Sequence, residues 1–243
     1  MKKWSPLNEA NKKTVNIDKW GNLKILKYSL KELDAIKNAI GKRIKMCEKV
    51  ASLITDRVSR GGRVLTIGAG GSGVAGMSVM RELPQNHRNL SPTNFFYIIA
   101  GNKRAFNPFG CEELEDDFDH GYKTVQDLTL DTNDTIILLS ATGRTPFILG
   151  AVKSAKNQGA LTVGISCCES ELISKVDLPI FLDVGPEIFV GATCEKAATA
   201  QKHVLDMIMN VVVVRLGITK KNICQARLVH KKAQIREHFF NAK

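Results

Sequence analysis

Residues 64–73 read Val64-Leu65-Thr66-Ile67-Gly68-Ala69-Gly70-Gly71-Ser72-Gly73. Apolar and β-branched residues run directly into a glycine-rich loop, and a periodic apolar segment follows from Val74 to Leu83. This order predicts a strand, a tight loop and a helix. Glycines let a ligand approach the backbone closely, and the start of a helix offers unpaired N–H groups with a partial positive charge. The segment therefore predicts a phosphate site.

A second segment of the same kind occupies residues 135–146. The β-rich run Thr135-Ile136-Ile137-Leu138-Leu139-Ser140 leads to Ala141-Thr142-Gly143-Arg144-Thr145-Pro146. Pro146 suits the first turn of a helix, where its missing N–H costs little. Two strand–loop–helix units rich in serine, threonine and glycine favour a compact phosphorylated sugar as the ligand.

The first loop also fits the dinucleotide-binding pattern, with Gly68, Gly70 and Gly73 at its three glycine positions. A dinucleotide site would require an acidic residue at the end of the next strand. The next predicted strand, Phe95 to Ala100, is instead followed by Gly101-Asn102-Lys103-Arg104. The sequence therefore favours the sugar phosphate over the dinucleotide.

Composition narrows the functional class. The chain has 243 residues, 44% of them hydrophobic, six cysteines and a net charge of +11. We expect a cytoplasmic protein with reduced thiols, because neither a membrane span nor a signal peptide is recognisable. The basic residues are dispersed and only 6% of the chain is aromatic, so we expect anionic metabolites as ligands and no nucleic acid. We expect no metal and no cofactor.

Strands and helices are predicted to alternate along the chain. The strands are expected at 63–67, 95–100, 135–140, 161–166 and 179–184, and the helices at 73–83, 111–127, 146–158, 193–216 and 222–240. Near-continuous apolar strands of this kind predict a mostly parallel five-stranded sheet covered on both faces. Residues 1–28 are expected to form an N-terminal arm and residues 29–243 a single domain. A capping box of Ser29 and Glu32 predicts the start of a long helix that ends at Gly61.

The predicted helix 193–216 is apolar almost all round in its second half. Such a helix is buried on more than one side. Burial in the core of one chain and burial against a second subunit both fit this pattern, and we expect a homodimer.

Three segments together resemble the sugar isomerase (SIS) domain family and, more closely, the N-acetylmuramic acid 6-phosphate etherases. They are 68–73, 140–146 and 184–191, the last reading Val184-Gly185-Pro186-Glu187-Ile188-Phe189-Val190-Gly191. The resemblance extends from about Asn16 to the C-terminus and implies a flavodoxin-like three-layer α/β sandwich.

The resemblance also implies a reaction. Etherases of this family cleave the D-lactyl ether of a phosphorylated amino sugar, which requires a base at C2 and an acid at the departing lactate oxygen. Carboxyl groups in a partly desolvated cleft can serve both roles. By position, Glu82 matches the acid and Glu112 the base, with Glu113 as the alternative base. A solvated glutamate at a helix end is the simpler interpretation of each.

Ligand-binding residues are implied by the same resemblance. They are Gly70, Gly71, Ser72, Ser140, Thr142, Gly143, Thr145, Thr193 and Lys196. The serines and threonines could also simply cap helices, and Lys196 could pair with a carboxylate or a phosphate.

The chain departs from the family pattern at several of these places. Gly71 replaces a threonine, Arg81 replaces a small residue, and Cys194 and Glu195 replace an arginine and a leucine. The alternatives to an etherase are therefore an aldose–ketose isomerase, which needs only one carboxylate, and a non-catalytic sensor of sugar phosphates.

Overall fold

The computed structural model describes residues 10–107, 112–191, 195–219 and 221–223, together with the isolated positions 231, 234, 235 and 238. Within these residues the chain forms one sheet with the strand order β2-β1-β3-β4-β5, and all four pairings are parallel. The strands are β1 (Val64–Gly68), β2 (Phe95–Ile99), β3 (Thr135–Leu139), β4 (Leu161–Ser166) and β5 (Leu178–Phe181). The five predicted strands and the parallel sheet are confirmed.

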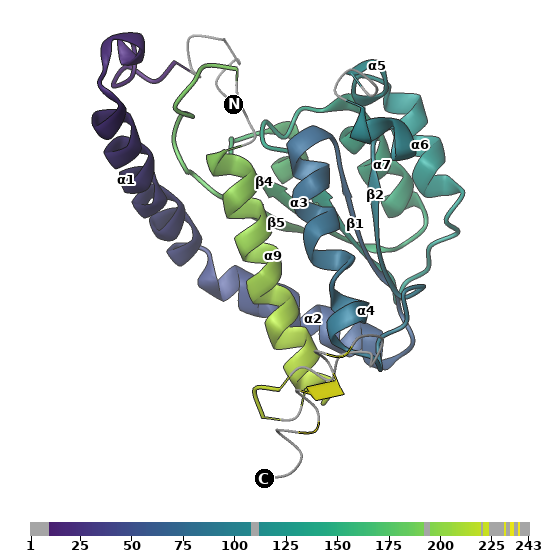
Figure 1. The fold of residues 1–243 in the computed structure, drawn as a ribbon. Coiled ribbons are helices and arrows are strands. Elements are labelled where there is room, and N and C mark those ends of the chain that lie inside the picture. The colour runs from purple at the N-terminus through teal and green to yellow at the C-terminus, as the bar shows by residue number, and fades with distance from the viewer. Residues whose placement is uncertain are drawn as a thin grey trace.

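Helices cover both faces of this sheet, as predicted (Figure 1). On one face pack α1 (Asn22–Gly41), α2 (Ile44–Ser59), α3 (Gly70–Met80) and α9 (Lys196–Arg215). On the other face pack α6 (Phe118–Gln126), α7 (Pro146–Asn157) and α8 (Glu171–Lys175). The short helices α4 (Leu83–Asn86) and α5 (Glu112–Glu115) follow α3 and β2, and the 3₁₀ turns η2 (Ile17–Lys19) and η3 (Asn102–Phe106) precede α1 and α5.

Alternation along the strands divides the core into two layers. Ile137 and Leu139 of β3 face the layer of α2 and α9, whereas Ile136 and Leu138 face α7. All five residues of β1 and of β3 are buried. Successive side chains of a strand point to opposite faces, so a continuous apolar run fits a central strand that is covered twice.

Helix α3 lies unusually close to β1. A Cβ atom added to Gly76 would lie 2.7 Å from Thr66 Oγ1 and 2.9 Å from Leu139 Cδ1, and one added to Gly73 would lie 2.7 Å from Ile99 Cγ2. Only glycine permits this approach. The glycines therefore seat α3 against the strands as well as shaping the loop before it.

Several predicted helix boundaries are wrong. Helix α1 begins after Gly21, whose backbone is extended, so Ser29 lies inside the helix and does not cap it. The predicted single helix is broken after Gly41, and α2 starts at Ile44. The predicted helix 111–127 is divided into α5 and α6, with Asp117 capping the second part through its bond from the His120 N–H.

Other predicted helices need smaller changes. The helix predicted at 73–83 begins three residues earlier, at Gly70, and α9 begins at Lys196. The predicted helix 222–240 lies mostly outside the described residues. No helix in the described part of the chain is long and apolar enough to cross a membrane.

The N-terminal arm is attached to the body at residues 187 and 188. The Asn11 amide donates to the Glu187 carbonyl at 3.1 Å, and the Thr14 hydroxyl donates to the Ile188 carbonyl at 2.7 Å. Asn11 and Thr14 are both buried. These bonds hold the arm against the segment that precedes α9.

A partly buried ion pair joins the amino ends of β1 and β3. Asp134 Oδ1 accepts from the Arg63 N–H at 2.7 Å, and Oδ2 accepts from Arg63 Nε at 3.1 Å. The Asp134 side chain is 2% exposed. Burial alone would raise the pKa of Asp134, but the Arg63 and Asp131 hydrogen bonds and the Arg63 charge hold this pKa below its ordinary value.

We predict that Asp134→Ala lowers the free energy of unfolding at pH 7 by about 2–3 kcal/mol, because it removes the charge-assisted hydrogen bonds that this carboxylate accepts from Arg63 and from the Asp131 N–H. A carboxylate with a lowered folded-state pKa stabilises the fold above its unfolded pKa and loses this effect as pH falls through the folded pKa. The difference from wild type should therefore shrink below pH ~4. Denaturant unfolding at several pH values measures it.

Glu171→Ala is the matched control, since its pair with Lys175 is exposed and should contribute less than about 1 kcal/mol. A stability loss for Asp134→Ala that is equal at pH 3 and pH 7 would contradict the prediction.

Candidate functional site

The two predicted phosphate loops lie side by side. Strands β1 and β3 are neighbours, and Gly68 at the end of β1 is in register with Leu139 at the end of β3. The chain reverses its direction across the sheet between these strands, because β2 lies on the far side of β1. Ligands of open parallel sheets bind in the crevice at this point, at the carboxyl ends of the strands.

The first loop presents the start of α3. Ala69 is extended, Gly70 has φ of +49°, and Ser72 lies in the first helical turn with only 6% of its surface exposed. The first N–H groups of a helix have no partner within the helix. Gly70, Gly71 and Ser72 therefore supply backbone donors at one point, as their sequence predicts.

The second loop is held by its own hydroxyls. Ser140 Oγ accepts from the Gly143 N–H at 2.9 Å and lies 2.9 Å from Thr145 Oγ1. Thr142 Oγ1 accepts from the Arg144 N–H at 3.3 Å. Ser140 is buried, whereas Thr142 and Thr145 are partly exposed. The three predicted hydroxyls thus gather on one short loop, and Thr145 immediately precedes α7.

Gly143 could not be replaced by another residue without distortion. Its φ is +65°, and an added Cβ would lie 1.9 Å from Ser170 Oγ and 2.7 Å from Ser166 Oγ. Ser170 Oγ lies 3.2 Å from Ser166 Oγ, which donates to the Cys168 carbonyl at 3.0 Å. The residues at and after the end of β4 therefore pack directly against the second loop.

Arg144 points its guanidinium along the same loop. It donates to the Thr142 carbonyl and to the Glu169 carbonyl, each at 3.2 Å. Two backbone bonds hold the positive charge at the edge of the loop. The charge lies where it can attract an anion.

Glu115 lies beside the first loop, although the sequence analysis did not single it out. A Cβ atom added to Gly70 would lie 3.2 Å from Glu115 Oε1. The carboxylate at the end of α5 therefore lies against the start of α3, beside the first phosphate loop. The signal available in the sequence was the topology, since the segment after β2 must cross back over the carboxyl end of β1 to reach β3.

The two predicted base residues lie on the same short helix. Glu112 is its first residue, and the exposed Glu113 is its second. The side chain of Glu112 lies outside the described part of the structure, so its role stays a prediction. In the described part of α5, Glu115 is the carboxylate placed against the glycine loop.

Glu82 lies at the other end of α3 from the phosphate loops. It follows the eleven-residue helix and precedes α4, and its side chain is exposed. Eleven residues of helix span about 16 Å. Figure 1 shows α4 near the amino ends of the strands and α5 near their carboxyl ends. Within a single chain, Glu82 therefore lies far from the two loops.

Lys196 is already paired. Its ammonium, 3% exposed, forms an ion pair with Glu32 of α1 and donates to the Val184 carbonyl at 3.0 Å. The pairing with a carboxylate was one of the two predicted alternatives. Thr193, predicted beside it, lies outside the described residues.

Glu187 caps the start of α9. Its two carboxylate oxygens accept from the N–H groups of Lys196 and Ala197, each at 2.9 Å. A carboxylate is stabilised at a helix N-terminus. The 184–191 segment, which carries the family resemblance, therefore fixes where α9 begins.

The thiol beside the site is not set up as a nucleophile. Cys167 follows β4 and is a free thiol. Burial, with smaller contributions from Cys168, Glu187 and Asp183, raises the pKa of this thiol. The thiolate is the reactive form, so this environment disfavours Cys167 as a nucleophile.

Comparison with known proteins identifies the family of this fold and site. A model of the SIS domain matches residues 27–167. N-Acetylmuramic acid 6-phosphate etherase of Clostridium beijerinckii is 37% identical over 215 residues, which cover 88% of this chain and 70% of the relative. The etherase of Bacillus subtilis is 35% identical over 214 residues, covering 88% and 70%.

Solved structures with little sequence identity share the fold. A phosphoheptose isomerase from Francisella tularensis superposes with a TM-score of 0.61 at 16% identity, covering 79% of this chain and 98% of that one. The Vibrio vulnificus NanR protein, solved in complex with ManNAc-6P, gives 0.55 at 14% identity, covering 94% and 70%. The solved structures establish the fold alone, whereas the sequence relatives establish the family. The chain belongs to the N-acetylmuramic acid 6-phosphate etherase family of SIS-domain proteins.

Proposed function

We propose that this protein cleaves the D-lactyl ether of N-acetylmuramic acid 6-phosphate or of a similar phosphosugar. One observation carries the proposal: two phosphate loops meet at the switch point of the sheet, and the Glu115 carboxylate lies against the first of them. Membership of the etherase family gives the substrate class. The cytoplasmic location expected from the sequence stays a prediction.

In this proposal the two loops hold the phosphate. The N–H groups of the first turn of α3 and the hydroxyls of Ser72, Ser140, Thr142 and Thr145 match the acceptor oxygens of a phosphate. Arg144 adds a positive charge at the rim. The ring-opened sugar extends from its C6 phosphate toward α5.

The reaction begins with loss of the C2 proton, which is acidic next to the C1 aldehyde. A carboxylate takes this proton, a C2–C3 double bond forms, and the C3–O bond breaks. A carboxylic acid gives its proton to the departing lactate oxygen. Water then adds at C3 and a proton returns to C2, so the sum is hydrolysis of the ether. Both carboxyl groups act as general catalysts and are regenerated.

We assign the base to α5. Glu115 is the stronger candidate, because its carboxylate lies beside the loop that would hold the phosphate. Glu112 remains the candidate that the family resemblance indicates. Only a few bonds separate C6 from C2 in the sugar, so a base for C2 must lie close to the phosphate.

We assign the acid to Glu82 of a second copy of the chain. Within one chain α3 separates Glu82 from the loops by about 16 Å, which is farther than the substrate extends between its phosphate and C3. A homodimer could place Glu82 of one copy at the loops of the other. The exposed side chain of Glu82 is available for this role.

An isomerase is the second candidate. Aldose–ketose isomerisation begins with the same loss of the C2 proton, and the proton returns to C1. It needs only the α5 carboxylate, which is the one that a single chain brings to the loops in the described residues. A protein that acts as a monomer would favour this reaction.

Ser140→Ala should weaken the binding of N-acetylglucosamine 6-phosphate roughly tenfold, because it removes a hydroxyl from the cradle and the bond from the Gly143 N–H. Titration calorimetry measures the change. Ser78→Ala, on α3 but bonded to the Ala75 carbonyl, is the control. Unchanged affinity in Ser140→Ala would exclude this loop as the phosphate site.

Glu115→Gln should lower kcat for D-lactate release from N-acetylmuramic acid 6-phosphate by about 10²–10⁴, as expected for loss of a general base. Glu112→Gln and Glu113→Gln, at the two candidate bases that the family resemblance indicates on the same helix, are compared with it and should change kcat less than ~10-fold when Glu115 is the base. Exchange of the C2 proton with deuterated water should fall in parallel. A large loss in Glu112→Gln alone would give the base to Glu112.

Glu82→Ala and Glu115→Ala should each be inactive, and their mixture should recover activity. A heterodimer of the two variants has one loop site with Glu115 intact that faces an intact Glu82, so equal mixing should restore about a quarter of wild-type activity. Refolding the two variants together and assaying lactate measures this. Activity that stays absent in the mixture, with subunit exchange verified by two tags, would exclude the shared site.

A further inference from the structure

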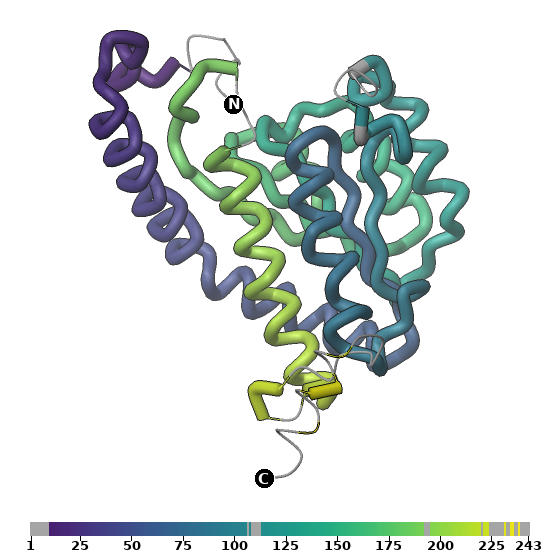
Figure 2. The backbone as a smooth tube through the Cα atoms, in the orientation of Figure 1, coloured from purple at the N-terminus to yellow at the C-terminus, as the bar shows by residue number. Residues whose placement is uncertain are grey.

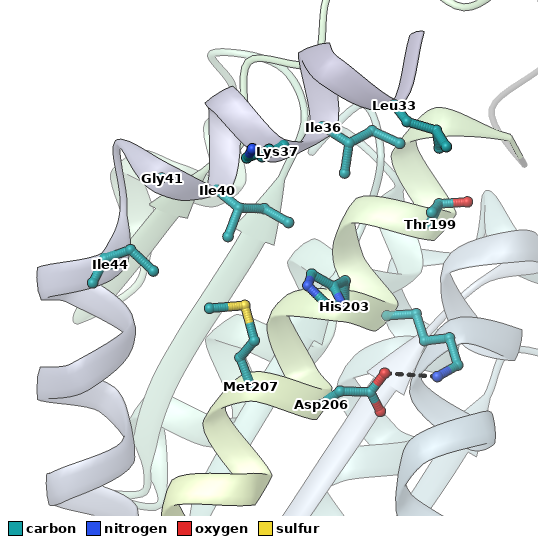
Figure 3. A pocket seen from close by; sticks show the side chains of 11 residues that line it. Leu33, Ile36, Lys37, Ile40, Gly41, Ile44, Thr199, His203, Asp206 and Met207 are labelled. Atoms are coloured by element: carbon teal, nitrogen blue, oxygen red, sulfur yellow. Dashed lines mark hydrogen bonds and ion pairs between the residues drawn. The ribbon is translucent and has the colours of Figure 1, made fainter. Parts of the chain in front are cut away.

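Gln201 is a fully buried polar residue on the inner face of α9, with a relative exposure of 0%. The outer face of this helix carries Thr199, His203 and Met207, which line the groove between α1 and α9 (Figure 3). The inner face packs on the sheet through apolar side chains, which are Ala200, Val204, Leu205 and Ile208. A carboxamide in such a layer is unfavourable unless its groups are hydrogen-bonded.

The carboxamide of Gln201 is paired on one side only. Its Nε2 donates to the Ile165 carbonyl at 3.4 Å, whereas its Oε1 is buried without a hydrogen-bond partner in the described part of the chain. Turning the amide over would set Oε1 against the Ile165 oxygen, and both atoms are acceptors. The orientation is therefore fixed by the bond that is made. Most buried polar groups in proteins are paired, so this exception requires an explanation.

The paired side of the amide lies directly behind the second phosphate loop. The Ile165 carbonyl also accepts from the Ser140 N–H, at 3.2 Å. A carbonyl oxygen has two lone pairs and can accept both bonds. One residue farther along, the Cys167 N–H donates to the Ala141 carbonyl at 3.0 Å. Gln201 is thus connected to Ser140 through a single carbonyl group.

We propose that Gln201 is a positioning residue of the second phosphate loop, which holds the Ile165 carbonyl from the α9 side and thereby sets the place of Ser140. The inference rests on the proposed function of this loop as a phosphate site. Ser140 Oγ accepts from the Gly143 N–H and lies 2.9 Å from Thr145 Oγ1, so a shift of Ser140 moves other groups of the loop. Binding groups have to be held within about 0.5 Å of their productive places by the residues behind them.

The place of Gln201 is itself set by the start of α9. Figure 2 shows the segment after β5 curving back to this end of α9, on the carboxyl side of the sheet. Glu187 caps the helix there, and Lys196 pairs with Glu32. Gln201 follows Lys196 by five residues, and side chains of a helix tilt toward its N-terminus. The carboxamide is therefore directed to the carboxyl end of β4, and it links the start of α9 to the second loop.

The unpaired oxygen distinguishes a role in the site from a role in packing alone. Replacing a buried polar group by an apolar group of the same shape is close to neutral or stabilising when no partner is left unpaired. Methionine at position 201 would meet this condition, because the Ile165 carbonyl keeps its bond from the Ser140 N–H. Proteins give up stability of this kind where function requires a particular group. The donor that Gln201 presents to Ile165 is that group.

Gln201→Met should leave the unfolding temperature equal to that of wild type or raise it by about 2–4 °C, because it removes the unpaired oxygen. The same variant should weaken the binding of N-acetylglucosamine 6-phosphate roughly fivefold to tenfold, measured by titration calorimetry. The KM for D-lactate release should rise by a similar factor, and kcat should change less than ~2-fold, since phosphate binding is shared by substrate and transition state.

Thr135→Val is the matched control. The Thr135 hydroxyl is also buried without a hydrogen-bond partner among the described residues, but it lies at the amino end of β3, away from the loop. Its loss should not lower the unfolding temperature and should leave the binding of N-acetylglucosamine 6-phosphate unchanged. In a Ser140→Ala background, Gln201→Met should weaken binding by less than ~2-fold more, because both changes act through the same residue.

A Gln201→Met variant that unfolds at a lower temperature and binds the phosphosugar as wild type does would overturn the inference and leave Gln201 a packing residue. Effects of Gln201→Met and Ser140→Ala that multiply in full in the double variant would also overturn it, because they would show that Gln201 does not act through Ser140.

Lactate release by the same samples separates this inference from the proposed function. The expected binding pattern in a wild-type chain that releases no lactate would keep the role of Gln201 and reject the etherase. Lactate release with an unaltered KM in Gln201→Met would reject the role of Gln201 and keep the etherase. A wild-type chain that binds neither N-acetylglucosamine 6-phosphate nor inorganic phosphate would reject both.

Discussion

The close approach of α3 to β1 is the constraint on which the rest of the site depends. Gly73 and Gly76 leave no room for a side chain between the helix and Thr66, Ile99 or Leu139. The start of α3 is consequently fixed at the carboxyl end of β1, beside the loop that follows β3. A helix seated even a few ångströms farther away would present its free N–H groups to water instead of to a shared ligand.

The same helix also sets a limit. Because α3 is seated along its whole length, its two ends are about 16 Å apart, and a carboxylate at each end cannot serve one small sugar. The chemistry of an etherase requires two carboxyl groups on one substrate. Among the described residues, a single chain brings the Glu115 carboxylate to the loops, and in the proposed reaction the second group comes from another copy. Catalysis and assembly are therefore linked in this proposal.

The ion pair of Lys196 and Glu32 joins α1 to the start of α9. Glu32 belongs to α1, and Lys196 begins α9 next to the segment that contains Glu187. Asn11 and Thr14 fasten the N-terminal arm to the same segment. Loss of Glu32 would leave the Lys196 ammonium, which is 3% exposed, without its ion pair, and an unpaired buried charge is costly. Direct side-chain contacts thus join the N-terminal arm, α1 and the segment before α9.

The sequence by itself determined the strands, the parallel sheet and the positions of the loops after β1 and β3, because the glycine and β-branched patterns that mark them are local in sequence. It placed Ser72, Ser140, Thr142 and Thr145 correctly on those loops. It misplaced the start of α1, since the Ser29 and Glu32 pattern is local and packing against α9 overrides it. Only the tertiary structure decided which carboxylates meet the loops. Glu115 lies close to Gly70 although 45 residues separate them in the sequence. Glu82 is nearer to Gly70 in the sequence, but the length of α3 separates the two in space.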